Sequence, residues 1–175
     1  MSSYYGWLAP TVKPRIFISY HHGGDRPYYD MLSRVFCDTY DVLQDNSVDR
    51  LIDSDNSEYV IRKIREDYIT GTSCTVVLCG AETPNRKFVD WEIKATLDRQ
   101  HGLIGINLPS NRSFADGTFP VPLRYLDNYH SGYAVWAHWQ DIISNVAYFT
   151  RLVQEAREKE PWLLVNTREL RTRNS

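Results

Sequence analysis

The run Cys74–Cys79, with the sequence CTVVLC, decides the fold class of this chain. It is apolar and rich in β-branched residues, and Gly80 ends it, so it predicts a strand that is buried on both faces. Two similar runs occupy residues 15–20 (RIFISY) and 103–108 (LIGINL). Strands buried on both faces are typical of parallel sheets covered by helices, so the chain is predicted to be an α/β protein.

Between and after these runs, apolar residues recur at the spacing of amphipathic helices. Asp25, which precedes Pro27, is predicted to cap the first helix, and Asp141 is predicted to cap the last. Gly102 is predicted to end the third helix. The predicted helices cover residues 26–40, 58–71, 87–100 and 141–159.

Two segments with a less clear apolar pattern, residues 41–44 and 134–139, are predicted to be further strands. The sheet is thus predicted to have about five strands. The predicted fold is a flavodoxin-like three-layer sandwich with a central parallel sheet. Residues 109–133 are rich in Pro, Gly, Asn and Ser and are predicted to form a long loop that covers a site. Ligands in such folds bind at the carboxyl ends of the strands, here in the loops after Tyr20 and Cys79.

The length of 175 residues and the hydrophobic fraction of 42% suit one domain with a sizeable core. The predicted division is an N-terminal arm at residues 1–14, a domain at 15–160 and a C-terminal tail at 161–175. The last part of this tail, residues 168–175, is polar and partly basic, and it is predicted to be disordered.

Twenty basic and 22 acidic residues leave a net charge of −2, which predicts binding to neither nucleic acid nor an anionic membrane. The three cysteines lack a CxxC spacing and are interpreted as buried thiols of a reduced compartment. No signal peptide or membrane span is indicated, so the expected location is the cytoplasm.

The loop after the first strand reads SYHHGGD from Ser19 to Asp25. Its hydroxyl, aromatic ring, imidazoles and flexible backbone suit contact with a ribose or a phosphate, although a glycine pair at such a turn can simply permit the turn. No metal site is predicted, because the adjacent His21 and His22 lack ligand spacing. A serine hydrolase is not indicated either, because the Gly-x-Ser-x-Gly motif is absent.

The loop and helix after Cys79 contain Glu92, which is the candidate catalytic residue. Glu92 is predicted to lie in the first two turns of its helix, about 60° from Val89, at the border of the apolar face. A carboxylate at that border is partly desolvated. The alternative is a glutamate that stabilises the helix dipole and pairs with Lys87 or Arg86.

The FISYH sequence that begins at Phe17, the stretch 80–86, and an aromatic residue four positions before Glu92 resemble the TIR-like proteins of bacterial antiphage defence. Among these, the chain especially resembles the TIR subunit of Thoeris systems and its relatives. The resemblance covers roughly residues 15–108. TIR enzymes commonly carry Trp-x-x-x-Glu at this helix, whereas this chain has Phe88 at the Trp position and Trp91 directly before Glu92.

The resemblance implies a TIR-like fold and cleavage of the nicotinamide glycosidic bond of NAD, which is the substrate and not a resident cofactor. Glu92 would stabilise the oxocarbenium-like ribose. A closed site would favour a cyclic ADP-ribose product by excluding water. The residues expected to contact NAD are Ser19, Tyr20, His21, Asn85, Arg86 and Phe88.

The resemblance also implies that a separate effector protein reads the nucleotide signal. A non-catalytic TIR-like interaction module is the alternative, and the Phe88 departure favours it. Self-association is expected as well, because many aromatic residues lie outside the predicted core: Tyr4, Tyr5, Trp7, Tyr125, Tyr129 and Tyr133.

Overall fold

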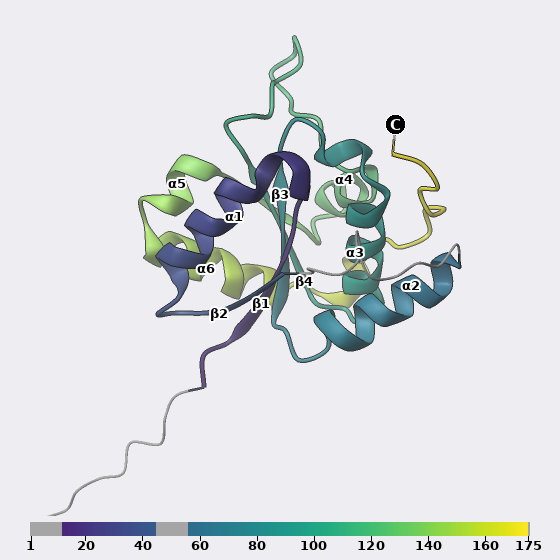
Figure 1. Cartoon of the computed structure of the whole chain (residues 1–175), viewed down its shortest axis with the longest axis horizontal. Coiled ribbons are helices and arrows are strands. Elements are labelled where there is room, and N and C mark those ends of the chain that lie inside the picture. The colour runs from purple at the N-terminus through teal and green to yellow at the C-terminus, as the bar shows by residue number, and fades with distance from the viewer. Residues whose placement is uncertain (1–11, 45–55, 175) are drawn as a thin grey trace, which may run out of the picture.

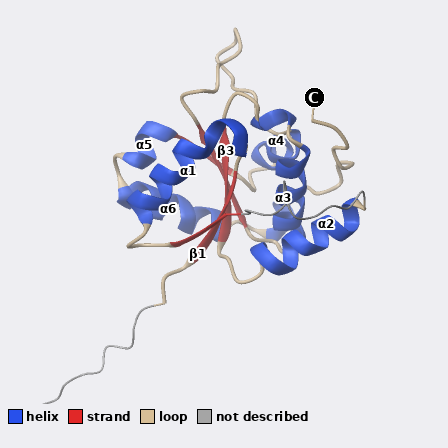
Figure 2. Cartoon of the chain, in the orientation of Figure 1, coloured by secondary structure: helices blue, strands red, loops and turns tan. Residues whose placement is uncertain are grey.

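A parallel sheet of five strands forms the centre of the computed structural model, which describes residues 12–44 and 56–174. The strand order is β2-β1-β3-β4-β5, the flavodoxin-like order, so the predicted fold class is confirmed. Figure 2 shows the sheet nearly edge-on between two layers of helices. The strands are β1 (Arg15–Ser19), β2 (Asp41–Gln44), β3 (Cys74–Cys79), β4 (Gly102–Asn107) and β5 (Val135–His138).

The strand register brings the carboxyl ends of the strands to one edge of the sheet. Cys79 pairs with Asn107, and Asn107 pairs with His138, so three strands end at the same level. Ser19 pairs with Val77, two residues before the end of β3. The loops that follow these strands therefore meet at one edge, as predicted.

Helices cover both faces of the sheet (Figure 1). One face carries α1 (His22–Phe36), α5 (Trp139–Ile143) and α6 (Val146–Arg157), and the other carries α2 (Ser57–Lys63), α3 (Lys87–Asp98) and α4 (Leu123–His130). Alternate residues of each strand face opposite layers. Accordingly, Ile16 and Ile18 belong to the cluster on the α1 face, and Phe17 belongs to a cluster with α2 and α3.

The first helix begins four residues earlier than predicted. His21 occupies the N-cap position of α1, and the N–H groups of Gly24 and Asp25 bond to its carbonyl oxygen. Asp25 is therefore a residue of the first turn and not the cap. The glycine pair, interpreted as a turn, is helical.

The helix predicted at 58–71 consists of α2 followed by a π-helix, η1 (Ile64–Ile69). The predicted role of Gly102 was wrong, because this residue opens β4. Helix α3 ends at Asp98, and Gln100 turns the chain with a φ of 55°. Glycine is needed at 102 because a Cβ there would lie 2.7 Å from the backbone of Ala156 in α6.

The predicted long loop at 109–133 contains a helix, α4, that the sequence reading missed. The helix predicted at 141–159 is also divided, into α5 and α6. Asn145, and not Asp141, provides the cap of α6, because its side chain accepts a hydrogen bond from Tyr148 N. Hence a second N-cap within the predicted range starts a new helix.

The C-terminal segment packs against the domain up to residue 174, which differs from the disordered tail predicted for residues 168–175. After η3 (Pro161–Leu163), residues 164–174 run along α4 and α3 (Figure 1). Asn128 of α4 bonds to both the N–H and the carbonyl oxygen of Val165. Arg168 forms an ion pair with Asp127 at 2.7 Å. Most of the predicted N-terminal arm, including Tyr4, Tyr5 and Trp7, lies outside the described residues.

Two of the aromatic residues expected outside the core are buried in it. Tyr125 and Tyr133 are each 1% exposed, whereas Tyr129 is 47% exposed. No helix within residues 12–44 and 56–174 is long and apolar enough to span a membrane.

Candidate functional site

The carboxylate of Glu92 meets the hydroxyl of Ser19 at the carboxyl edge of the sheet. Ser19 Oγ donates a hydrogen bond of 2.5 Å to Glu92 Oε2, between residues 73 positions apart. Ser19 is fully buried and Glu92 is 5% exposed. The structure therefore brings together two of the residues expected at the site, in a dry environment.

Helix α3 places Glu92 in its second turn, on the side that faces β1. A line of polar groups continues from there along the helix. Thr96 Oγ1 donates to the carbonyl oxygen of Glu92 at 2.8 Å and lies 2.7 Å from Thr75 Oγ1 of β3. The hydroxyl groups between α3 and the sheet thus have hydrogen-bond partners. These bonds fix the rotation of α3 and the direction of the Glu92 carboxylate.

Two residue pairs join the segment after β1 to the loop after β3, namely His21 with Glu82 and Asp25 with Thr83. His21 Nε2 lies 3.3 Å from Glu82 Oε2, and Arg86 forms an ion pair with the same carboxylate. The second pair is deeper, because Asp25 and Thr83 are both buried and Thr83 Oγ1 lies 3.0 Å from Asp25 Oδ2. The loops predicted to carry the chemistry are therefore held against each other.

Asp25 and Thr83 are buried beside the loops at the carboxyl edge of the sheet, and neither is among the site residues predicted from the sequence. The Thr83 hydroxyl also lies 3.0 Å from the carbonyl oxygen of Leu78 and accepts from Gly80 N at 3.0 Å. Burial raises the pKa of the Asp25 carboxyl, while its hydrogen bond with Thr83 acts in the opposite direction. The nearby Pro27 made Asp25 look like an N-cap, and no local signal indicated a partner 58 residues away.

Gly80→Ala is expected to lower the free energy of unfolding by about 1–3 kcal/mol, the usual cost of overpacking. A Cβ at this position would lie 2.3 Å from Asp25 Oδ1, in a carboxyl group that Thr83 holds in place. Denaturation with urea measures the change. As a control, Gly24→Ala should lower the free energy of unfolding much less. Its Cβ would lie 3.4 Å from its nearest neighbour, His21 Cδ2, which is an ordinary van der Waals distance. Combining Gly80→Ala with Asp25→Ala should recover part of the loss, and a double variant as unstable as the single one would contradict this explanation.

Other residues expected to contact NAD lie apart from Glu92. The ring of Tyr20 stacks with His22 and Tyr29, at centroid distances of 4.4 and 5.0 Å, within the cluster on the α1 face. It therefore lies on the opposite side of the sheet from Ser19, its neighbour in the chain. Asn85 is exposed, at the end of the 3₁₀ helix η2 (Thr83–Asn85).

Phe88 packs within a small aromatic group on α3. Its ring lies 5.2 Å from that of Trp91, and the Lys87 ammonium lies 5.0 Å from the Phe88 centroid. Trp91, which is 6% exposed, belongs to the core between α2 and α3. The aromatic residue at the position of the family's tryptophan thus contributes to the packing of α3.

The cysteines do not form a disulfide among the described residues, and burial makes two of them poor nucleophiles. Cys74 and Cys79 are fully buried in β3, as predicted, but the prediction was wrong for Cys37, which is exposed. Burial raises the pKa of Cys74 to about 12 and also raises that of Cys79. Because the thiolate is the reactive form, the two buried residues act as core side chains. In the part of the chain that the structure describes, no group of His, Cys, Asp and Glu could hold a metal ion.

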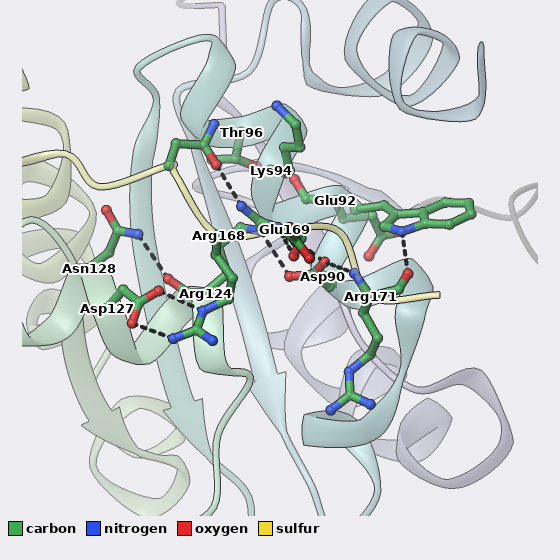
Figure 3. Close-up of polar contacts among 12 residues, drawn as sticks. Asp90, Glu92, Lys94, Thr96, Arg124, Asp127, Asn128, Arg168, Glu169 and Arg171 are labelled. Carbon is green, nitrogen blue, oxygen red and sulfur yellow. Dashed lines mark hydrogen bonds and ion pairs between the residues drawn. The ribbon is translucent and has the colours of Figure 1, made fainter. Parts of the chain in front are cut away.

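A buried ion pair behind the site links α3 to α4 (Figure 3). Arg124, which is fully buried, donates to both carboxylate oxygens of Asp90, at 2.8 and 3.3 Å. The same guanidinium donates to Asn166 Oδ1 at 2.9 Å and to the carbonyl oxygen of Glu169 at 3.1 Å. All four contacts are charge-assisted, and two of them reach the C-terminal segment.

The C-terminal segment also contacts the first turns of α3 directly. Arg171 N donates to Asp90 Oδ2, and Trp91 Nε1 donates to the carbonyl oxygen of Arg171, both at 2.9 Å. Asn174 Oδ1 accepts from Lys87 N at 2.8 Å and so satisfies one of the free N–H groups at the helix start. The segment therefore fixes α3 from the side that faces away from Ser19.

A pocket of about 670 Å³ lies between α3, α4 and the C-terminal segment. Neither Ser19 nor Glu92 is among its lining residues. Its volume alone is a weak argument for an active site, and the buried carboxylate remains the stronger chemical feature. The lining residues are Pro84, Asp90, Pro122, Leu123, Asp127, Val165, Thr167, Arg168, Glu169 and Arg171.

The parallel sheet in the order 2-1-3-4-5, with a glutamate of α3 beside the end of β1, defines a flavodoxin-like domain of the TIR-like class. A family model described as Thoeris protein ThsB, TIR-like domain, matches residues 17–113, more than half of the chain. The chain therefore belongs to the TIR-like family of the Thoeris defence proteins. A comparison with curated proteins found no match.

Proposed function

We propose that this TIR-like protein cleaves the bond between nicotinamide and ribose in NAD, with Glu92 as the catalytic carboxylate. The observation that carries the proposal is the buried Glu92 carboxylate and its bond to Ser19 at the carboxyl edge of the sheet. A carboxylate in such a dry position interacts strongly with a positive charge. Family membership supports a role in defence and is compatible with this chemistry.

In the proposed reaction, the C1′–N bond breaks and its electron pair leaves with neutral nicotinamide. The ribose becomes oxocarbenium-like, and the Glu92 carboxylate stabilises its positive charge. A ribose hydroxyl would replace the Ser19 hydroxyl as the donor to Glu92. Water then completes hydrolysis with loss of a proton, or a nucleophilic atom of the ADP-ribosyl group closes a ring. His21 and Arg86, which lie at the joined loops, are the candidate contacts for the rest of NAD.

The product would be an ADP-ribose-derived nucleotide, in cyclic form, that activates a separate defence effector. Cyclisation requires that water be kept from the ribosyl cation. Residues 109–122, which extend beyond the sheet edge in Figure 1, are the candidate cover in the substrate complex. The experiment is incubation of the protein with NAD, with and without phage infection products, followed by mass spectrometry of the nucleotides. Formation of nicotinamide with cyclic ADP-ribose is expected, and intact NAD under both conditions would overturn the proposal.

One observation favours the alternative of a non-catalytic interaction module. Glu92 is only 5% exposed, and its carboxylate is already bonded to Ser19, so NAD must open the site in order to reach it. A module would retain the pair as a structural contact between β1 and α3. The NAD incubation distinguishes the two functions, because the module leaves the nucleotide intact.

We also propose that the protein self-associates, and we expect light scattering to show a species larger than the monomer. Tyr129, which is 47% exposed, is an aromatic residue that suits such a contact. Contact between copies would order the loops at the sheet edge. A strict monomer at high protein concentration, both with NAD and with the infection products, would contradict this expectation.

A further inference from the structure

An aromatic pocket of about 300 Å³, here called the β5 pocket, lies between β5, α4 and the loop before α4. This volume is at the lower end of the range for small-molecule sites. None of its described lining residues is Asp, Glu, Lys or Arg, so a buried ligand group would be uncharged. The lining residues are Gly117, Thr118, Phe119, Val121, Tyr125, Leu126, Tyr129, His130, Trp136 and His138.

Aromatic rings form the walls of the β5 pocket. Phe119 lies 6.3 Å from Trp136 and 5.7 Å from His138, measured between ring centroids. Trp136 and His138 are two residues apart on β5, so both face this side of the sheet. Tyr125 lies 5.9 Å from Trp136, and its hydroxyl donates to the carbonyl oxygen of Val135 at 2.7 Å.

The wall formed by Tyr125 is preorganised by its neighbours. A Cβ at Gly105 of β4 would lie 2.4 Å from the Tyr125 ring. Because glycine has no side chain, the space above this position is filled by the ring. The Tyr125 ring is 1% exposed and is held at its far end by the bond to Val135. A planar ligand would therefore stack in the pocket at a low cost in side-chain ordering.

A chain of amide hydrogen bonds fixes the tautomer of His138. Asn111 Nδ2 lies 3.0 Å from the carbonyl oxygen of Pro120, which can only accept, so this end of the Asn111 amide is the NH₂ group. The same NH₂ group donates to Asn107 Oδ1 at 3.1 Å. Asn107 Nδ2 must then donate to His138 Nδ1, at 3.2 Å. In neutral His138 the proton consequently lies on Nε2, which is a hydrogen-bond donor.

From these observations we propose that the β5 pocket binds an uncharged planar heteroaromatic ring with an acceptor nitrogen at its edge, of the nucleobase class. The ring stacks on Trp136 and Phe119, and His138 Nε2 donates to its edge nitrogen. Strands β3 and β4 separate β5 from β1, which places the pocket about 14 Å from the strand that carries Ser19. The site is thus distinct from the Ser19–Glu92 pair, and it takes either a free nucleoside or the base of a larger nucleotide.

Calorimetric titration with adenosine tests the proposal, and saturable binding to the wild-type protein is expected. Trp136→Ala should weaken binding by about 10-fold or more, the scale of the loss of one stacking partner. His138→Phe keeps an aromatic ring and removes the donor, so it should weaken adenosine binding while leaving the binding of indole unchanged. Trp162→Ala, which removes an exposed tryptophan outside the pocket, is the matched control and should bind adenosine as the wild type does.

Absence of saturable adenosine binding to the wild type would overturn the proposal, as would an equal loss in the Trp136→Ala and Trp162→Ala variants. Thermal unfolding checks that the variants fold. If Trp136→Ala does not fold, Phe119→Ala removes a loop residue of the same pocket and should weaken binding by a similar factor. Unchanged binding in a folded Phe119→Ala variant would also count against the site.

Titration of NAD into the Glu92→Gln variant identifies the source of the base. Competition between adenosine and NAD, with weaker NAD binding after Trp136→Ala, supports the base of NAD as the occupant. Adenosine binding without competition supports a separate nucleoside. Both results support the pocket, and neither requires NAD cleavage, so a failure of the proposed enzymatic function leaves this test intact.

Discussion

Replacement of Glu92 by glutamine is expected to lower NAD turnover by about 10²- to 10³-fold, the usual cost of removing one preorganised electrostatic partner. Glutamine keeps the size of the side chain, and its carbonyl oxygen can still accept from Ser19. The negative charge opposite the ribosyl cation is lost. Turnover is measured as nicotinamide release under single-turnover conditions, which separates the chemical step from product release.

The folded state of Glu92→Gln should be as stable as the wild type, because the hydrogen bond remains and a buried charge is removed. Glu155→Gln is the matched control, since it makes the same change at an exposed position on α6, where Glu155 pairs with Lys159. Turnover in this control should equal that of the wild type. A Glu92→Gln protein with undiminished turnover would exclude Glu92 as the catalytic group. Loss of both turnover and stability would indicate a structural role.

Arg124→Met is expected to lower the free energy of unfolding by about 3–5 kcal/mol, the cost of leaving one partner of a buried ion pair without the other. Arg124 is fully buried, and its replacement would leave the Asp90 carboxyl group, at 6% exposure, without its guanidinium partner. The contacts to Asn166 and to the carbonyl oxygen of Glu169 would be lost together with the ion pair. Denaturation with urea gives the free energy, and hydrogen exchange should show faster exchange in residues 164–174.

Arg168→Met is the control, because the ion pair of Arg168 with Asp127 is partly exposed to solvent and pairs of this kind contribute about 1 kcal/mol or less. The double variant Arg124→Met with Asp90→Leu should lose less stability than the sum of its single changes, since it leaves no charge unpaired. If Arg124→Met and Arg168→Met lowered the free energy of unfolding equally, the buried ion pair would not be what holds the C-terminal segment.

The strands could be predicted from the sequence because each is a short apolar run, and burial on both faces requires little else. The run Cys74–Cys79 was predicted with its observed bounds, β1 ends one residue earlier than predicted, and β4 begins and ends one residue earlier than predicted. The helix that carries Glu92 could also be predicted, because its apolar spacing is local. The border position of Glu92 then follows from 3.6 residues per turn, but at 5% exposure the side chain is buried more deeply than this position predicts.

The errors in the fold have a common cause, which is that the deciding partner is distant in the chain. Gly102 looked like a helix terminator, but the backbone of Ala156 requires the glycine. Asp25 looked like a cap, but its carboxyl group packs against Gly80 and bonds to Thr83. A short polar residue or a glycine has several local uses, so only its three-dimensional neighbours distinguish among them.

By itself, the sequence determined the α/β class, the parallel sheet, the edge at which the loops meet and the helix position of Glu92. All of these follow from apolar periodicity over a few residues. Only the tertiary structure decided that Ser19, and not Tyr20, faces Glu92 and that polar residues 164–174 fix α3. The β5 pocket likewise depends on β4, β5 and α4 coming together. Hydrogen bonds between residues 30 to 80 positions apart leave no periodic pattern, because their free energy depends on geometry that exists only in the folded chain.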